Sequence, residues 1–543
     1  MSAARARRLV LLLAAGCGAA QGGDGAQDDA AAVGLAAIRP EALRAHVLFL
    51  ADDALEGRGA GTRGHRVAAQ YVATQLAALG LEPAGDRGTY FQDVPLRAMT
   101  RDDAGCSLAV DGAAVAAEHV IVYPFAARDR LEVEAPLVYG GFGIVAADQK
   151  YDDLGDVDLR GKVVVVLRGA PPAFAPATSR AVHSDFDNKA ARLAERGAVA
   201  MLVVNTPEGE KVRSWAERRA DAQFEAMEWM EGDRPGSGAT IPSASIDMEA
   251  FATLLGPGAD AGKLWDEAAA GRARARALGR TVRLRVASTF RDVTSQNVAA
   301  VLRGGDPARA GEHVVFSAHL DHLGVGAPVA GDAIYNGAID DAIGVAGVLE
   351  IARAFAALPA RPPRSILVLV VTAEEKGLLG SDYFVHHPTV PMSSIIADVN
   401  LDGPFPFYEM FDVVALGDAH STLRRNVEEA ARSMRVAVSD DPSPEQAYFI
   451  RSDQYSFVKR GVPSLFPGVG YKDATGDTTR NHAIGEAWSH AHYHQPSDEW
   501  RDGENRADWA AKEVRLDFLI GLSIARDPRR PSWNPGDIFA TPR

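Results

Sequence analysis

Residues 365–371 read SILVLVV, an unbroken aliphatic run that is followed at once by the polar stretch TAEEKG at 372–377. Apolar and polar residues do not alternate here, so both faces of the segment must be covered, as in a central strand of a parallel sheet. Similar runs occupy 297–302, 313–318, 395–401 and 413–416, and amphipathic helical patterns occupy 342–358, 378–387, 421–434 and 507–527. This alternation predicts a layered α/β domain over residues 290–543.

Length and composition exclude several classes of protein. The chain has 543 residues, 47% hydrophobic and 24% charged, which is globular composition but too long for one core. It carries 57 Lys and Arg against 72 Asp and Glu, a net charge of −15, so its surface would repel nucleic acid and anionic membranes. Two cysteines, Cys17 and Cys106, cannot build a disulfide framework or a cysteine metal cluster. Any metal must be held by His, Asp and Glu.

The N-terminus has the pattern of an export signal. Arg5, Arg7 and Arg8 precede an apolar run at 9–15 that is too short to span a bilayer, and small residues lead into Cys17. This resembles a bacterial lipoprotein signal, which predicts a signal peptide at 1–17, a lipid anchor on Cys17 and a periplasmic or cell-surface location. A plain secretory signal, with secretion of the protein, is the alternative. The Gly- and Ala-rich segment 18–37 predicts a flexible linker.

Residues 38–289 divide into two parts. Residues 38–99 are expected to form the N-terminal part of the α/β domain, with a helical pattern over 40–95. The glycine-rich loop LEGRGAGT at 55–62 has no Gly-Lys-Ser/Thr and gives no phosphate signal. Residues 100–289 contain short strand-like runs at 163–167 and 200–204 and a helical stretch at 189–196, without an acid–base cluster. The strings GKVVVVLRG and ERGAVAMLVVNTPEG resemble the protease-associated (PA) domain, so an inserted β-rich domain that contributes to substrate access is expected.

Five polar motifs follow the expected strands or precede the next element. They are SAHLDHLG at 317–324, NGAIDDAIG at 336–344, TAEEKG at 372–377, NLDG at 400–403 and YHQPSD at 493–498. Singly, each is explained by helix capping or a solvated helix start. Together they predict one site, because carboxyl ends of parallel strands meet at one sheet edge. Imidazoles and carboxylates suit a zinc pair, and the dipeptide Glu374–Glu375 offers both a ligand and a metal-free base.

In this order the five motifs resemble the co-catalytic di-zinc aminopeptidase family, which includes secreted bacterial leucyl aminopeptidases and, more distantly, glutamate carboxypeptidase II. The resemblance implies a three-layer α/β zinc exopeptidase domain with a mixed sheet, interrupted by the PA domain, and two Zn²⁺ per chain. The ligands it implies are His319 and Asp402 for one zinc, Glu375 and His494 for the other, and Asp340 as the bridge.

The same resemblance assigns the supporting residues. Glu374 would be the general base, and the Asp340–Asp341 peptide would be cis. Asp321 and Asp498 would orient His319 and His494, and Tyr493 would stabilise the oxyanion. His322, His490 and His492 are alternative ligands by position, and Asp453 fits either a pocket or a structural role.

The predicted function is an exported zinc aminopeptidase that acts on peptides with a free N-terminus. A dipeptidase or carboxypeptidase on the same metal platform is an alternative. The segment FPGVGY at 466–471 lacks the arginines that bind a terminal carboxylate in the glutamate carboxypeptidase branch, which disfavours the carboxypeptidase. A single-metal glutaminyl cyclase and a non-catalytic, receptor-like binding protein are also compatible with this scaffold. A degenerate ligand set would mark the receptor-like protein, and the motifs show none.

Overall fold

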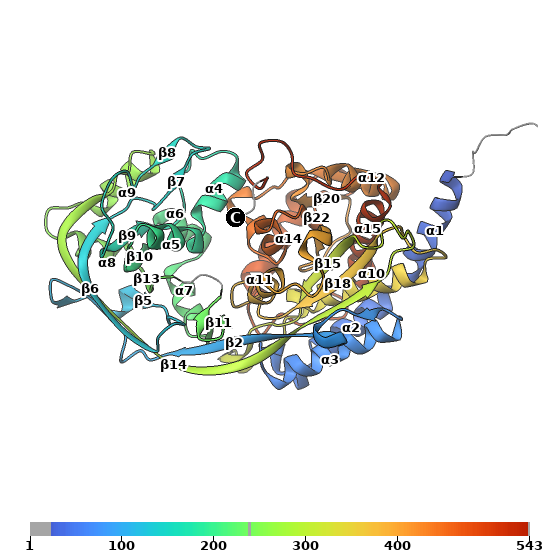
Figure 1. Cartoon of the computed structure of the whole chain (residues 1–543), viewed down its shortest axis with the longest axis horizontal. Coiled ribbons are helices and arrows are strands. Elements are labelled where there is room, and N and C mark those ends of the chain that lie inside the picture. Colours follow the sequence, from blue (N-terminus) through green and yellow to red (C-terminus); the bar gives the residue numbers. More distant parts are fainter. Residues whose placement is uncertain (1–22, 237–239, 541–543) are drawn as a thin grey trace, which may run out of the picture.

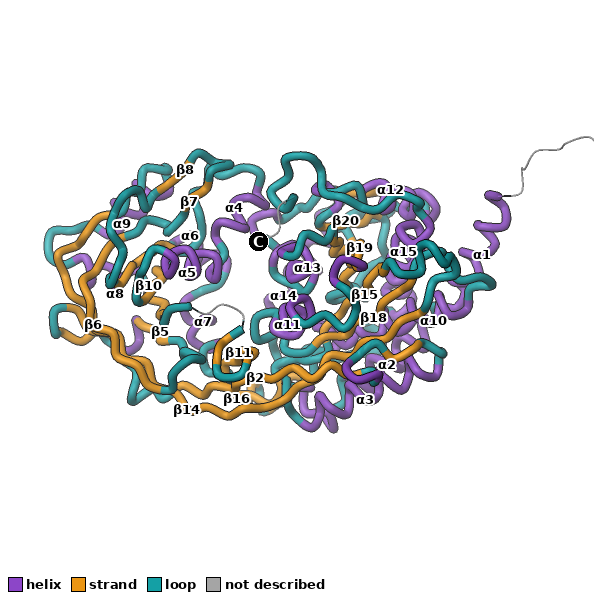
Figure 2. Tube along the Cα trace, in the orientation of Figure 1, coloured by secondary structure: helices purple, strands orange, loops and turns teal. Residues whose placement is uncertain are grey.

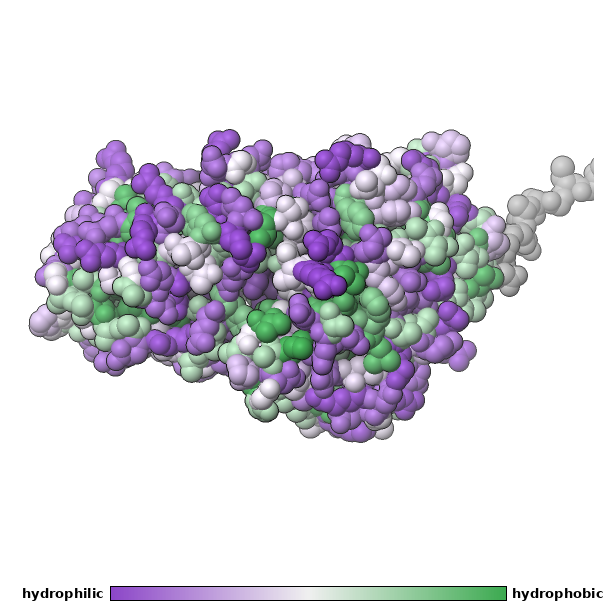
Figure 3. All heavy atoms as spheres, turned by 90° about the horizontal axis from the view of Figure 1, so that it is seen from below, coloured by the Kyte–Doolittle hydropathy of each residue, from purple (hydrophilic) through white to green (hydrophobic). Residues whose placement is uncertain are grey.

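Two domains lie side by side and are joined by long paired strands (Figure 1). The computed structural model describes residues 23–236 and 240–540, so the expected signal peptide and Cys17 lie outside the described residues. None of the helices in those ranges combines the length and apolar character needed to cross a membrane. The face seen in Figure 3 is largely hydrophilic, with small scattered hydrophobic patches.

The C-terminal domain is built on a mixed sheet. Strand β15 (His313–His319) is parallel to β18 (Ser365–Val371) and β19 (Ile395–Asn400), and β19 is parallel to β22 (Ser464–Val469). Antiparallel strands flank this centre: β14 (Arg276–Leu302) pairs with β18, and β20 (Asp412–Leu416) pairs with β22. All residues of β18 are buried, as the run SILVLVV predicts.

Helices cover both faces of this sheet. Phe316 and Val368 face the larger core, which is formed with α2 (Pro40–Leu50), α3 (Arg63–Ala78), α10 (Ile343–Ala357), α12 (Arg424–Met434) and α15 (Ala507–Arg526). The alternate residues Val315 and Leu367 face a smaller core under α11 (Leu379–His386) and α13 (Gln454–Lys459). This helix–sheet–helix arrangement confirms the predicted α/β fold class.

The inserted domain has its own core. Strands β6 (Arg130–Tyr139), β9 (Val163–Leu167), β10 (Ala200–Val204) and β13 (Ser243–Ile246) form a parallel row, flanked by α5 (Phe186–Glu195) and α8 (Met248–Leu255). Helix α4 (Ala177–Ser184) packs instead against Phe449 and Phe539 of the C-terminal domain. The expected strands at 163–167 and 200–204 therefore have the observed bounds, because each is an unbroken apolar run.

The two domains share strand β14. Its N-terminal part pairs with β3 (Ser107–Val110) and β6 in the inserted domain, and its C-terminal part pairs with β18. Between them, residues 288–298 of β14 pair with β2 (Phe91–Arg101). Figure 2 shows this ribbon running along the lower side of the inserted domain and on into the C-terminal domain, where α2 and α3 lie below it. The expected boundary at 289/290 thus falls inside one continuous strand.

Two expectations for the N-terminal region differ from the structure. Gly23–Ala37, within the expected flexible linker at 18–37, forms helix α1 and packs on the larger core. Arg515 of α15 donates hydrogen bonds to the backbone carbonyls of Leu35 and Ile38, and Gly34 lies so close to the Phe518 ring that a Cβ would be 2.3 Å from it. The helical pattern over 40–95 also ends early, because residues 91–95 belong to β2.

Candidate metal centre

The polar motifs converge at one edge of the parallel strands. His319 ends β15, Glu374 and Glu375 follow β18, and Asp402 follows β19. His319 is paired with Val371, so these strand ends are adjacent. Asp340 lies in the helical turn Ala338–Ala342 that precedes α10. His494 comes two residues after α14 (Thr479–His492).

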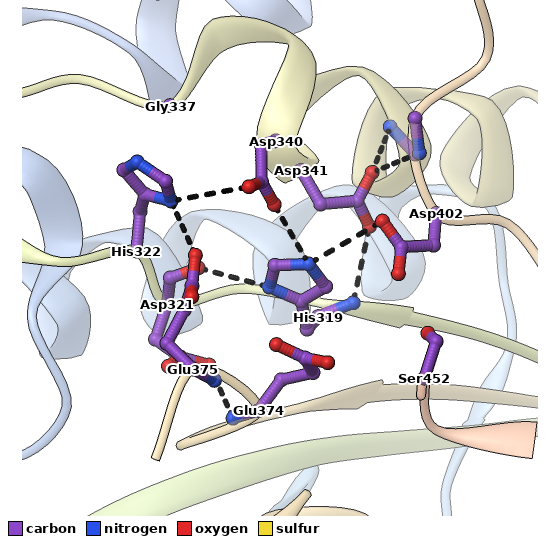
Figure 4. A network of polar contacts seen from close by, with 12 residues as sticks. His319, Asp321, His322, Gly337, Asp340, Asp341, Glu374, Glu375, Asp402 and Ser452 are labelled. Carbon is purple, nitrogen blue, oxygen red and sulfur yellow. Dashed lines mark hydrogen bonds and ion pairs between the residues drawn. The ribbon is translucent and has the colours of Figure 1, made fainter. Parts of the chain in front are cut away.

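Asp340 lies between two groups of donor atoms (Figure 4). Its Oδ1 is 3.2 Å from His319 Nε2, which is also 3.6 Å from Asp402 Oδ1. Its Oδ2 is 3.3 Å from His494 Nε2, which is also 3.2 Å from Glu375 Oε2. The five side chains expected as ligands are thus brought together, with Asp340 at the position expected of a bridge.

His322 also enters the second group. Its Nδ1 is 2.6 Å from Glu375 Oε1 and 3.9 Å from Asp340 Oδ2, and its side chain is completely buried. Three ligand atoms, one each from His322, Asp340 and Glu375, lie within 4.8 Å of one another, as do those of His319, Asp340 and Asp402. The geometry therefore brings two imidazoles, not one, to Glu375. The remaining two nearby histidines point elsewhere, since His490 is exposed and His492 Nδ1 lies 2.9 Å from Ser497 Oγ.

These residues fit a pair of zinc ions. Buried charges are costly unless they are paired or bind a metal. Asp340 Oδ2 and His322 Nε2 are buried and have no hydrogen-bond partner among the described residues. Nitrogen from imidazole and oxygen from carboxylates are the donors that Zn²⁺ accepts, and a carboxylate between two donor groups suits a two-metal site.

The pKa values of the histidines show that carboxylate charge dominates this site. Burial lowers the pKa of His319, but the charge of Glu374 and the hydrogen bonds to Asp340 and Asp402 raise it well above its usual value. Burial likewise opposes the protonated form of His494, yet Glu375 and Asp340 raise its pKa to about 10. The carboxylates of the site therefore stabilise positive charge at both histidine positions.

The Glu374 carboxylate lies within this cluster but is not hydrogen-bonded to the other described side chains in it. Burial, with the nearby charges of Glu375 and Asp453, raises the pKa of Glu374 well above its usual value although His319 opposes this. Its carboxylate lies beneath His319 (Figure 4), and no hydrogen bond or ion pair to that carboxylate occurs among the described residues. With no hydrogen-bond donor on it among the described residues, the carboxylate is placed to exchange a proton with a bound molecule. Asp453 is also fully buried, and burial raises its pKa to about 7.

Asp321 and Asp498, the residues expected to orient the histidines, make their hydrogen bonds with backbone groups or through their own backbone. His319 Nδ1 is 3.0 Å from the backbone carbonyl oxygen of Asp321, whereas the Asp321 carboxylate accepts hydrogen bonds from the Glu374 and Glu375 amides at 3.1 and 3.4 Å. The Asp498 carboxylate accepts from the Ile339 and Asp340 amides, both at 3.0 Å. Asp498 therefore holds the Asp340 turn and has no hydrogen bond to His494 among the described residues.

Two neighbours complete the site. The Asp340–Asp341 peptide is cis, as the resemblance implies. Asp341 accepts hydrogen bonds from the backbone amides of Gly344 and Gly403 at 2.9 Å each and from that of His319 at 3.2 Å. The bond from the Gly344 amide is the helix-capping contact that an Asp pair before a helix suggests, and the bonds from Gly403 and His319 go beyond it. The Tyr493 ring is stacked on His494 with centroids 3.9 Å apart.

Comparison with known proteins agrees with this site. The model of peptidase family M28 matches residues 297–519, and the PA domain model matches 133–254. The chain is similar to probable leucine aminopeptidase 2 of Aspergillus fumigatus, with 25% identity over 425 residues that cover 75% of this chain and 68% of the relative. It is 26% identical over 321 residues to the Aspergillus oryzae protein of the same name, covering 58% of this chain and about half (52%) of that relative.

A solved structure has the same fold. The aminopeptidase from Aneurinibacillus sp. strain AM-1 aligns over 94% of this chain and 98% of its own length, with a TM-score of 0.52 and 18% identity. The resemblance noted from the five motifs is thereby confirmed, as is the expected PA domain. Over residues 297–519 the chain matches peptidase family M28, and its metal-binding donor set and inserted PA domain agree with a hydrolase of that kind.

Proposed function

We propose that this protein is an exported aminopeptidase that uses two zinc ions to remove N-terminal residues from peptides. The observation that carries the proposal is the convergence of His319, Asp340, Glu375, Asp402 and His494 around a free carboxylate, that of Glu374. The similarity to probable leucine aminopeptidases supports the reaction class. The pattern of residues 1–17, which lie outside the described ranges, supports export.

In this proposal each of the two donor groups would bind one metal ion. His319 and Asp402 would hold one zinc and Glu375 and His494 the other, and each Asp340 oxygen faces one of these groups. When bound, such a pair supplies Lewis acidity and lowers the pKa of water. His322, which contacts Glu375 at 2.6 Å, keeps that carboxylate in place.

The chain's own residues then move the protons. The Glu374 carboxylate accepts a proton from the attacking water and returns it to the nitrogen of the leaving amine. The amides of Glu374 and Glu375, bonded to the Asp321 carboxylate, fix the backbone that carries this base. Tyr493, held against His494, donates its hydroxyl proton in a hydrogen bond to the oxyanion of the tetrahedral intermediate.

Hydrolysis of aminoacyl-anilides by the purified protein tests this function. Activity should disappear with a chelator, return with zinc, and fall by about 10²–10⁴-fold in Glu374→Gln. Glu409→Gln, at an exposed position paired with Lys512, is the control and should keep full activity. A preference for N-blocked peptides with a free C-terminus would indicate the carboxypeptidase instead. Full activity of Glu374→Gln would refute the assigned base.

Metal analysis provides the second test. Two zinc ions per chain are expected after purification and zinc loading. Less than one zinc per chain, with no hydrolysis of any peptide in the panel, would favour the receptor-like binding protein.

A further inference from the structure

Arg58 is a buried cation behind the donor groups, and the mechanism above does not use it. Its side chain is 0% exposed. Its guanidinium donates hydrogen bonds to the backbone carbonyl oxygens of Leu320 (2.8 Å), Asn336 (2.7 Å), Gly337 (2.9 Å) and Leu50. Among the described residues it bonds no carboxylate, so it is not half of an ordinary salt bridge.

The carbonyls that Arg58 binds belong to the loops that carry metal donors. Leu320 lies between His319 and Asp321, and Asn336 and Gly337 lie just before Asp340. One planar guanidinium therefore connects the loop after β15 with the loop before α10. A fork of fixed donors can hold several acceptors in fixed relative positions, which a lysine ammonium cannot do.

The surrounding loop reinforces this connection. The Asn336 side-chain amide donates to the Ala51 carbonyl and to Asp53 Oδ1, both at 2.8 Å. On the other side, the Gly61 amide donates to Ser295 Oγ at 3.0 Å, and Ser295 Oγ is 2.6 Å from Thr372 Oγ1. Thr372 precedes the Glu374–Glu375 pair. The loop at 55–62 is therefore hydrogen-bonded to the segments that carry His319 and Asp340 and, through Ser295, to the segment that carries the Glu pair.

The backbone of this loop takes an uncommon conformation to place the guanidinium. Glu56, Gly57 and Arg58 have φ values of 50°, 63° and 51°, in the left-handed region that non-glycine residues rarely adopt. A Cβ on Gly57 would lie 2.3 Å from the Tyr335 carbonyl oxygen. Such conformations persist where the surrounding contacts require them.

Arg58 also balances charge. Asp321, Asp340, Asp341 and Asp498 all interact electrostatically with it. A permanent positive charge behind them reduces the mutual repulsion of these carboxylates before any cation binds.

We infer that Arg58 is a positioning residue that fixes the His319 loop relative to the Asp340 loop, so that the donor group of His319, Asp340 and Asp402 is formed before metal binds. This inference rests on the proposed function. It places a determinant of metal affinity in the glycine-rich loop at 55–62, outside the five polar motifs.

Arg364 offers a matched control. It is 1% exposed and, like Arg58, donates to backbone carbonyls, those of Ile524 (3.0 Å), Arg529 (3.4 Å) and Asp527, with Glu312 as a further acceptor. It precedes β18 and so lies at the opposite end of that strand from the donor groups. Arg364→Lys therefore reports the cost of losing a buried guanidinium without disturbing the site.

The test is a zinc titration of the apo full-length protein against a chromophoric chelator, for wild type, Arg58→Lys and Arg364→Lys. Arg58→Lys should weaken the zinc site that contains His319 by about 10–100-fold. Arg364→Lys should lower the unfolding midpoint but leave both zinc affinities unchanged. If Arg58→Lys does not fold, Asn336→Ser, which removes only the ties to Ala51 and Asp53, should show a smaller loss of affinity.

The outcomes separate this inference from the function on which it rests. Wild-type zinc affinity in Arg58→Lys, or in Asn336→Ser where that variant replaces it, overturns the positioning role while the metal site stands. An equal loss of affinity in Arg364→Lys overturns it as well, since the effect would then be general destabilisation. A wild-type protein that binds no zinc refutes the proposed function.

Discussion

A buried acidic pair on α15 should make the stability of this protein fall as the pH rises. Glu513 and Asp517, one helical turn apart, are 3% and 1% exposed. Burial raises the pKa of Glu513 from 4.5 to about 8, although its hydrogen bond from the Phe405 amide opposes the rise. Burial and the neighbouring Glu513 raise the pKa of Asp517 well above its usual value.

The sign follows from proton linkage. A carboxyl group with a raised pKa in the folded state binds its proton more tightly there than in the unfolded chain. Its contribution is fully present below pH 4.5 and is lost as the pH rises towards 8. The slope is about 1.4 kcal/mol per pH unit, which corresponds to a loss of about 3 kcal/mol between pH 5 and pH 7.

Glu513→Gln removes this titration and keeps an acceptor for the Phe405 amide. The free energy of unfolding of the variant, relative to wild type, should therefore increase by about 3 kcal/mol between pH 5 and pH 7, measured by urea unfolding. Glu350→Gln is the matched control. Although burial opposes it, the contacts with His46, Arg39 and Arg353 lower the pKa of Glu350 below 4.5, so its contribution is present at both pH 5 and pH 7 and is lost only below pH 4.5. The difference between this variant and wild type should therefore hardly change between pH 5 and pH 7. A difference between Glu513→Gln and wild type that does not change with pH would refute the reasoning.

Two further predictions concern the metal and the core. Removing zinc with a chelator should lower the unfolding midpoint, because zinc at a thousandfold excess over its Kd stabilises the folded state by about 4 kcal/mol. Scanning calorimetry should show this drop in His490→Gln, whose side chain is exposed, and a smaller drop in His319→Ala. An unchanged midpoint in wild type would contradict the metal site. Phe316→Ala should lower the free energy of unfolding, measured with urea, by about 3–5 kcal/mol, because the ring is 0% exposed and its centroid lies 5.7 Å from that of Phe355. Phe316→Leu is a milder control, and a loss below about 1 kcal/mol in Phe316→Ala would contradict the assigned core.

The sequence predicted the central strands and the meeting point of the polar motifs. Runs such as SILVLVV have no polar face, which leaves a buried strand as the simplest interpretation. Parallel pairing then required His319, the Glu374–Glu375 pair and Asp402 to lie at one edge.

Other features depend on contacts that a linear pattern does not record. Helix α1 is Ala-rich and is held against α15 by the hydrogen bond from Arg515 to the Leu35 carbonyl and by the packing of the Phe518 ring on Gly34. Helix α14, which ends just before His494, has no clear apolar face and was not expected. His322 reaches Glu375 only once β15 and β18 are adjacent, and Arg58 gave no signal because its partners are backbone carbonyls.

The strand shared by the two domains limits how the protein can be taken apart. Because β14 belongs to both sheets, the insert is not a cassette that can be excised at two loops. Removing 100–289 would cut β14 and remove β11 (Ala226–Glu231), which pairs with residues 96–99 of β2, and so leave an open edge prone to self-association. Chimaeras with other family members should therefore exchange the insert together with the whole β2–β14 ribbon.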